Sequence, residues 1–140
     1  MKKVRNVFWI VGIAASLAAC SSREELKRQQ YYVEGERLYG VYCANCHQPD
    51  GRGLVNLYPP IHPPGDKKRF IQIAKYGIDK EITVDGVTYN RPMPANLNLT
   101  NLEIAEIATF VYNKWGDDKA YTPIDTVRKV LDLFPETDLR

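Results

Sequence analysis

The sequence contains few residues of the types that bind metals or carry redox chemistry. Its 140 residues include three cysteines, two histidines and two methionines. A formal net charge of +2 gives no electrostatic reason to expect nucleic-acid binding. With 44% hydrophobic and 26% charged residues, the composition argues against a disordered, collagen-like or multi-pass membrane chain. The length predicts one compact domain with short appendages, so the positions of these seven residues matter most.

Residues 1–19 have the features of an export signal. Three basic residues precede an apolar run over residues 7–19, which is shorter than the about 20 residues needed to span a bilayer. The sequence Leu17-Ala18-Ala19-Cys20 resembles the lipobox of bacterial lipoproteins. We therefore expect cleavage before Cys20 and a lipid on its thiol. A plain secretory signal or an uncleaved anchor helix is the alternative.

The lipid predicted on Cys20 determines the expected location. Three acyl chains on this residue would give stable anchoring on the periplasmic side of a membrane. Ser21 and Ser22 do not form an Asp-type signal for retention in the inner membrane, which favours the outer membrane. Cleavage leaves 16 basic and 17 acidic residues, and thus a net charge of −1. Residues 20–30 are expected to form a lipidated tether.

The other two cysteines belong to the motif Cys43-Ala44-Asn45-Cys46-His47, which in an exported chain is typical of c-type haem attachment. Two thiols one helical turn apart can form thioethers to the two vinyl groups of one porphyrin, with His47 as the proximal iron ligand. A thioredoxin-like pair would need a βαβ context, and a zinc site would need four ligands. A disulfide between helical cysteines at this spacing has poor geometry. The motif predicts one covalent haem c.

Met93 is the candidate for the second axial ligand, on the haem face opposite His47. It is the only methionine after residue 19, and the flanking Pro92 and Pro94 favour an extended, rigid loop. The alternative is a core methionine that fills a gap. His62 is a rival ligand, but it follows His47 by only fifteen residues. We expect His62 on the proximal side and solvated.

A proline-rich loop after the motif offers carbonyl oxygens without competing donors. An axial histidine usually donates its other ring N–H to a carbonyl, which fixes the tautomer and raises the basicity of the ligand. We expect the acceptor for His47 to be the carbonyl of Pro59 or of Pro60, and Pro60 is included in the predicted haem-binding set.

Hydrophobic patterning predicts a mostly helical scaffold. The expected elements are helices over residues 24–46, 66–75 and 101–115, a hairpin over 81–89, and a last helix that starts at Thr122-Pro123. Asp85-Gly86 between two β-favouring runs is the hairpin signal. Thr100 and Glu103 form a capping box that opens the third helix. Gly35 in the first helix would let another helix approach closely.

From about Gly35 to Arg128 the chain resembles a class I cytochrome c. It is most similar to the single-haem domains found with copper nitrite reductases, quinoprotein alcohol dehydrogenases and haem–copper oxidases. The matching segments are Gly35-x-x-Leu38-Tyr39, the Cys43–His47 motif, Asp50-Gly51-x-Gly53, Tyr58-Pro59-Pro60-Ile61, residues 82–90, Met93-Pro94 and Phe110 to Gly116. The resemblance implies that Gly35 and Tyr39 cross the third helix near Phe110 and that His47 and Met93 are the axial pair. Arg91 stands where the family has a small residue.

The expected protein is an all-α, cytochrome c-like fold around one covalently bound haem, with a small hairpin before the axial methionine loop. The cytochrome domain is expected over residues 31–116, and residues 117–140 as a helical extension that packs on it. A His/Met-ligated iron has no open position, which favours electron transfer over catalysis. Expected partners are respiratory redox proteins and the membrane, and no nucleic acid. The chain is expected to be a monomer or a subunit of a complex. The alternatives are a relay subunit of a larger oxidoreductase, or a peroxidase or gas sensor with a labile Met93.

Overall fold

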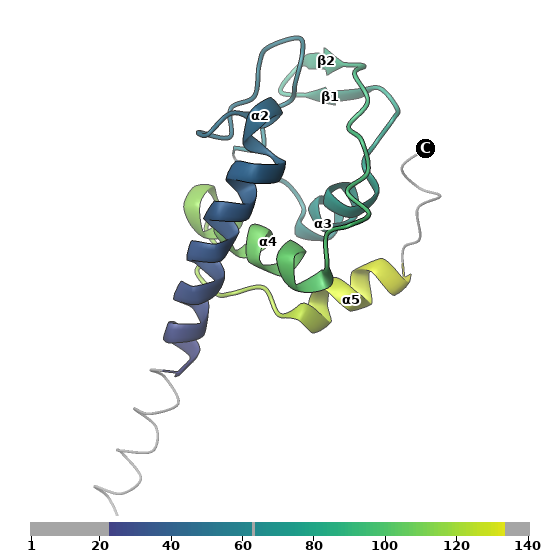
Figure 1. Cartoon of the computed structure of the whole chain (residues 1–140). Helices are drawn as coiled ribbons and strands as arrows, with labels where there is room; N and C mark the ends of the chain where they lie inside the picture. Colours follow the sequence, from purple (N-terminus) through teal and green to yellow (C-terminus); the bar gives the residue numbers. More distant parts are fainter. Residues whose placement is uncertain (1–22, 63, 134–140) are drawn as a thin grey trace, which may run out of the picture.

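The computed structural model describes residues 23–62 and 64–133, and helices dominate this part of the chain (Figure 1). An N-terminal helix covers the described residues 23–42, and the further elements are α2 (Ala44–His47), α3 (Lys67–Tyr76), β1 (Ile82–Val84), β2 (Val87–Tyr89), α4 (Asn101–Trp115) and α5 (Ile124–Leu133). No helix within the described ranges is long and apolar enough to cross a membrane. The signal predicted at residues 1–19 and the lipid predicted on Cys20 lie outside the described residues.

The helix α4 forms the centre of the fold. Thr100 Oγ1 accepts the backbone N–H of Glu103 at 3.2 Å, and Glu103 Oε2 accepts the backbone N–H of Thr100 at 2.8 Å, so the predicted capping box is confirmed. Most of α4 is buried; the buried residues are Ile104, Ala105 and Ile107 to Asn113. Both α3 and α5 pack on α4 and on each other. This arrangement leaves little of α4 in contact with solvent.

The N-terminal helix crosses α4 where Gly35 lies. A Cβ atom at Gly35 would stand 2.0 Å from the carbonyl oxygen of Glu106 and 2.9 Å from Cβ of Phe110. Tyr39, one turn later, packs against Phe110 with a ring-centroid distance of 5.5 Å. The predicted close approach at Gly35 and the crossing near Phe110 are both confirmed.

Residues 24–30 were expected both within the tether and within the helix predicted over 24–46, and in the structure they lie in the N-terminal helix. Lys27 Nζ lies 4.7 Å from the ring centroid of Tyr121, and Tyr31 packs edge-on against the same ring at 5.2 Å. The guanidinium of Arg28 donates to Oδ1 of Asn113 at 2.9 Å. These contacts attach the first described turns to the end of α4 and to the segment that follows it.

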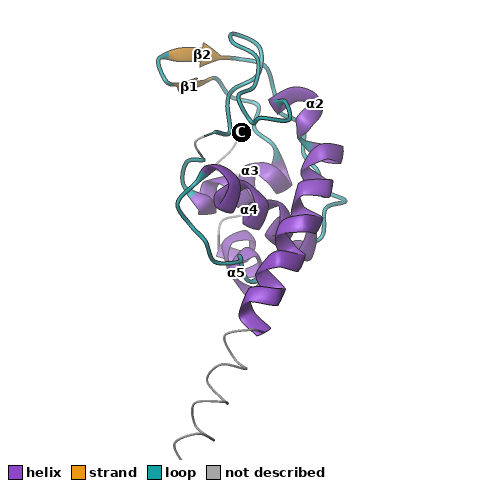
Figure 2. Cartoon of the chain, turned by 90° about the vertical axis from the view of Figure 1, so that its left-hand side faces the viewer, coloured by secondary structure: helices purple, strands orange, loops and turns teal. Residues whose placement is uncertain are grey.

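The short hairpin is antiparallel, with Ile82 opposite Tyr89 and Val84 opposite Val87. Asp85 and Gly86 have φ angles of 50° and 77°, as expected for a two-residue turn with two left-handed positions. The predicted hairpin is therefore confirmed. Figure 2 shows the hairpin and α2 at one end of the molecule and α5 at the other.

Candidate functional site

Cys43 and Cys46 are free, half-buried thiols one helical turn apart. The helix is interrupted at Cys43, whose carbonyl accepts the backbone N–H groups of Cys46 at 3.2 Å and of His47 at 2.9 Å. Burial, with a smaller contribution from the nearby Cys46, raises the pKa of the Cys43 thiol to about 12. The structure thus holds two unpaired sulfur atoms on one turn, which is the arrangement that thioether formation requires.

The His47 side chain is buried, with 7% of its surface exposed, and it is fixed by one hydrogen bond. Its Nδ1 lies 2.9 Å from the carbonyl oxygen of Pro59. A carbonyl can only accept, so Nδ1 carries the proton and Nε2 keeps its lone pair. Burial lowers the pKa of His47, although the bond to Pro59 opposes this shift. The side chain is therefore a neutral imidazole, the form that ligates iron.

The carbonyl that accepts the hydrogen bond from His47 belongs to Pro59 and not to Pro60. Pro60 was included in the predicted haem-binding set as a candidate acceptor, and this role is wrong. The reason lies in the turn at Gly53, whose N–H donates to the carbonyl of His47 at 2.9 Å. Gly53 has φ +64°, and a Cβ there would stand 2.6 Å from the carbonyl oxygen of Pro59. This close approach brings the Pro59 carbonyl to the imidazole.

His62 lies in the same loop as Pro59. Its backbone N–H donates to the carbonyl of Gly51 at 3.0 Å, which attaches it to the turn that follows His47. The ring is stacked on Trp115, with centroids 5.9 Å apart and an interplanar angle of 19°, and the residue is half-buried. The prediction of a solvated histidine is therefore wrong in part, since Trp115 covers one face of the ring.

Met93 lies in an extended loop that is attached to the end of α3. It exchanges two backbone hydrogen bonds with Ile78: Met93 N–H donates at 2.8 Å and Ile78 N–H at 3.0 Å. Met93 is half-buried and lies outside the helices and the hairpin. This setting differs from that of a gap-filling core methionine on a helix, and it fixes the backbone from which the thioether extends.

An aromatic cluster lies behind the His47 loop, and only its contact between Tyr39 and Phe110 was expected from the sequence. Tyr39, Phe110 and Trp115 contact one another with centroid distances between 5.2 and 5.5 Å. Tyr39 also donates its hydroxyl to the carbonyl of Gln48 at 2.7 Å, and a Cβ at Gly51 would stand 2.9 Å from the Trp115 ring. Trp115 at the end of a buried helix was the available signal, because such a ring must pack against a neighbouring segment.

These residues fit a covalently attached haem. The donor set consists of two free thiols on one turn, a neutral imidazole with an available Nε2, and a thioether in a fixed loop. A c-type haem takes thiols at its vinyl groups, and nitrogen and sulfur donors at its iron.

Residues 32–115 match the sequence profile of the family described as cytochrome c. The chain belongs to the cytochrome c family. Two proteins named cytochrome c-552 from Thermus thermophilus are 31% identical over 95 residues, which span 62% of this chain and 72% and 64% of those relatives. The fructose dehydrogenase cytochrome subunit of Gluconobacter japonicus is 31% identical over 129 residues, 82% of this chain but 25% of that subunit.

Membership of this family accounts for the thiol pair. Cytochromes c carry covalently attached haem c, and Cys43 and Cys46 stand in the attachment motif. The observed architecture, mostly helical with a two-stranded hairpin, agrees with the predicted cytochrome c fold. The chain is an electron-transfer protein in the general sense of its family.

Proposed function

We propose that the protein is a membrane-anchored carrier of single electrons, with His47 and Met93 as the axial ligands of its haem. The observation that carries this proposal is the Pro59–His47 hydrogen bond together with the Met93 loop fixed on Ile78. His47 would supply a neutral imidazole to the iron and Met93 a thioether, and a methionine ligand raises the reduction potential of a haem. Its partners are redox proteins of a respiratory chain.

A bound haem would supply a one-electron redox centre, and His47 and Met93 would be the side chains that ligate its iron. The protein keeps the His47 ring in one orientation through Pro59, so that oxidation and reduction need little reorganisation. The loops around Gly53 and Gly77 hold the two ligand-bearing backbones in place. We infer that the chain itself is not an enzyme, because this ligand set leaves no position for substrate.

Absorption spectroscopy of the ferric protein tests the ligand pair. The far-red band that marks sulfur–iron coordination is expected in the wild type, absent in Met93→Ala and retained in His62→Ala. Retention of the band in Met93→Ala would overturn the assignment of Met93. Absence of the band in the wild type would instead favour the peroxidase or gas-sensor alternative, in which Met93 is labile.

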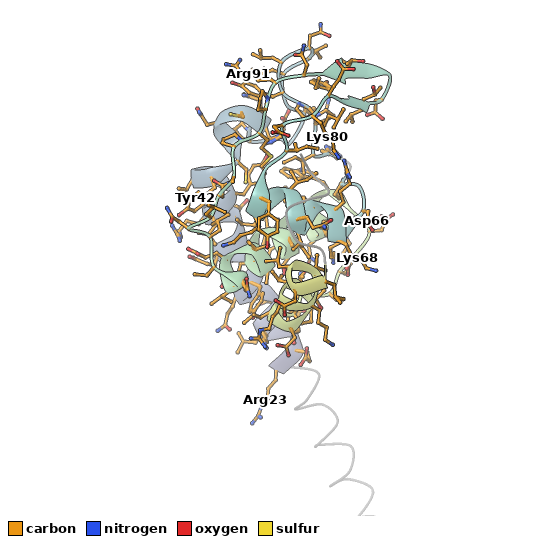
Figure 3. The ribbon with its side chains drawn as sticks, turned by 90° about the vertical axis from the view of Figure 1, so that its right-hand side faces the viewer. Arg23, Tyr42, Asp66, Lys68, Lys80 and Arg91 are labelled. Atoms are coloured by element: carbon orange, nitrogen blue, oxygen red, sulfur yellow. The ribbon has the colours of Figure 1, made fainter. Side chains whose placement is uncertain are left out.

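The membrane anchor is the part of the proposal that depends on Cys20. The helix described from residue 23 to 42 rises about 1.5 Å per residue and is therefore about 30 Å long. Because Cys43 follows directly on this helix, the haem-attachment motif lies about 30 Å from Arg23, the first described residue. Figure 3 shows Arg23 and Arg91 at opposite ends of the molecule. We propose a periplasmic location, with the outer membrane favoured by Ser21 and Ser22.

Cell fractionation tests the anchor. The wild type is expected in the membrane fraction, Cys20→Ser in a soluble or unprocessed form, and Ser22→Ala as in the wild type. A Cys20→Ser variant that is processed and stays on the membrane would contradict lipid anchoring but would leave the ligand pair unaffected.

A second candidate is a relay subunit within a larger oxidoreductase. The similarity to a dehydrogenase cytochrome subunit over 82% of this chain favours it. A stable partner should then co-purify from detergent-solubilised membranes without cross-linking. Recovery of the chain alone would favour the free carrier, since transient redox encounters use small and weak interfaces.

A further inference from the structure

Arg91 contacts Tyr58 across the two loops that carry the proposed ligands. The guanidinium carbon of Arg91 lies 5.1 Å from the ring centroid of Tyr58, within the range of a cation–π interaction. Arg91 stands two residues before Met93, and Tyr58 directly precedes Pro59, the acceptor for His47. This one contact therefore joins the segment that presents the thioether to the segment that orients the imidazole.

The two flanks of Met93 are held very differently. After Met93, the backbone N–H of Asn96 donates to the carbonyl of Lys75 at 3.0 Å, and Lys75 Nζ donates to Leu97 O at 2.8 Å and Leu99 O at 2.6 Å. Before Met93, residues 90–92 are exposed. Among the described residues, the contact of Arg91 with Tyr58 is the one ring or polar side-chain contact that this stretch makes. Between Tyr89, which is buried in the hairpin, and Met93, the chain is thus held by Arg91.

Tyr58 is a fixed partner for this contact. Its backbone N–H donates to the carbonyl of Leu54 at 2.8 Å, and its carbonyl accepts the N–H of Leu54 at 2.9 Å. A Cβ at Gly53 would lie 2.3 Å from the Tyr58 carbonyl oxygen, so the loop is closely packed there. Tyr58 is half-buried, and its fixed backbone limits how far the ring can follow Arg91 if the Met93 loop moves away.

We propose that Arg91 and Tyr58 form a clasp that keeps the Met93 loop closed on the haem. Both are positioning residues: they act through the loop backbones, and neither is an iron ligand. The proposal rests on the His47/Met93 ligation proposed above. An exposed cation–π contact is worth up to a factor of about 5 in an equilibrium constant, so loss of the clasp should raise the fraction of molecules with Met93 detached by about that factor.

Binding of imidazole to the ferric haem protein measures this fraction, because imidazole must displace Met93. We expect Arg91→Ala and Tyr58→Leu each to bind imidazole about five-fold more tightly than the wild type. The double variant should show no further gain, since both changes break the same contact. Arg91→Lys, which keeps a cation for the ring, and Tyr58→Phe, which keeps the ring, should restore most of the wild-type affinity.

Arg52→Ala is the matched control. Arg52 is an exposed arginine near the His47 motif that pairs with Asp50 at 3.8 Å, and among the described residues it forms no cation–π pair with Tyr58. Its removal changes the charge by the same amount and should leave imidazole affinity unchanged.

Three results would overturn the clasp: wild-type affinity in Arg91→Ala, an effect of Arg91→Ala that Tyr58→Leu does not share, or additive effects in the double variant. The far-red band of Met93→Ala distinguishes failure of the clasp from failure of the ligand assignment. If Met93→Ala loses the band while Arg91→Ala binds imidazole like the wild type, Met93 is a ligand and only the clasp is wrong. If Met93→Ala keeps the band, the ligand assignment itself is wrong.

Discussion

Gly77 lies directly against the carbonyl group of Met93. A Cβ atom at Gly77 would stand 2.2 Å from that oxygen, and the residue has a φ of +69°. The same residue ends α3, where its N–H donates to the carbonyl of Ile73 at 2.8 Å. A glycine directly after a helix is a common signal of a helix end, but the contact of Gly77 with the Met93 backbone is a second role that no local pattern indicates.

Replacement of Gly77 should therefore disturb both stability and ligation. Gly77→Ala requires the Met93 backbone to move and places a side chain in a left-handed conformation, which should cost about 1–3 kcal/mol. We expect a weaker far-red band and a lower denaturant midpoint for the ferric haem protein. Gly65→Ala is the control, because nothing lies within 4 Å of a Cβ at Gly65. A Gly77→Ala protein with both properties unchanged would contradict this role.

Two glycines of the N-terminal helix should respond in opposite directions. Gly35→Ala would place a Cβ 2.0 Å from the Glu106 carbonyl oxygen and push the helix away from α4, at a cost of about 2–3 kcal/mol. Gly40→Ala meets nothing within 4 Å and should stabilise the protein by about 0.5–1 kcal/mol through helix propensity. Urea unfolding of both variants checks this, and equal midpoints would show that the crossing tolerates a side chain.

The features that the sequence predicted well depend on short stretches of chain. The turn at Asp85 and Gly86 and the capping box of Thr100 and Glu103 each need only a few neighbouring residues, so their patterns identify them directly. Gly35 was recognisable because a glycine within a helix has a cost that close packing can explain.

The remaining features depend on contacts between distant segments. Pro59 and Pro60 offer adjacent carbonyls, and only the turn at Gly53 decides which of them reaches His47. The stacking of His62 on Trp115 joins residues 53 positions apart, and Arg91 meets Tyr58 across 33. No periodicity predicts such pairs, because each depends on how the whole fold places its loops.

The ring of Tyr121 should determine the stability of the first described helical turns. Lys27 and Tyr31 both contact this ring, at 4.7 and 5.2 Å. Tyr121→Ala removes both contacts, and we expect amide hydrogen exchange at residues 27–31 to become about tenfold faster. Leu26→Ala, at a side chain 57% exposed, is the control and should change little. Unchanged exchange in Tyr121→Ala would show that other contacts hold this segment.

Glu106, whose carbonyl faces Gly35, should make the protein less stable as pH rises. Burial, and next the negative charges of Glu34 and Glu103, raise the pKa of its carboxyl to about 7, although Arg37 opposes them. In the unfolded chain this group titrates near its ordinary value of 4.5. Between these two values the folded state binds more protons than the unfolded state, so the free energy of unfolding falls as pH rises from about 4.5 to about 7 and then levels off.

Glu106→Gln should remove most of this loss. Because the carboxyl is only half-buried, solvent screening limits the effect to about 1 kcal/mol. At pH 8 we expect Glu106→Gln to be more stable than the wild type by about that amount, whereas at pH 4 the two should unfold at the same denaturant concentration, since the wild-type carboxyl is then protonated in the folded state. Glu36→Gln, at an exposed position on the N-terminal helix, is the control. An equal gain for Glu106→Gln at both pH values would show that the loss of charge is not its cause and that the amide instead makes a better contact at this position.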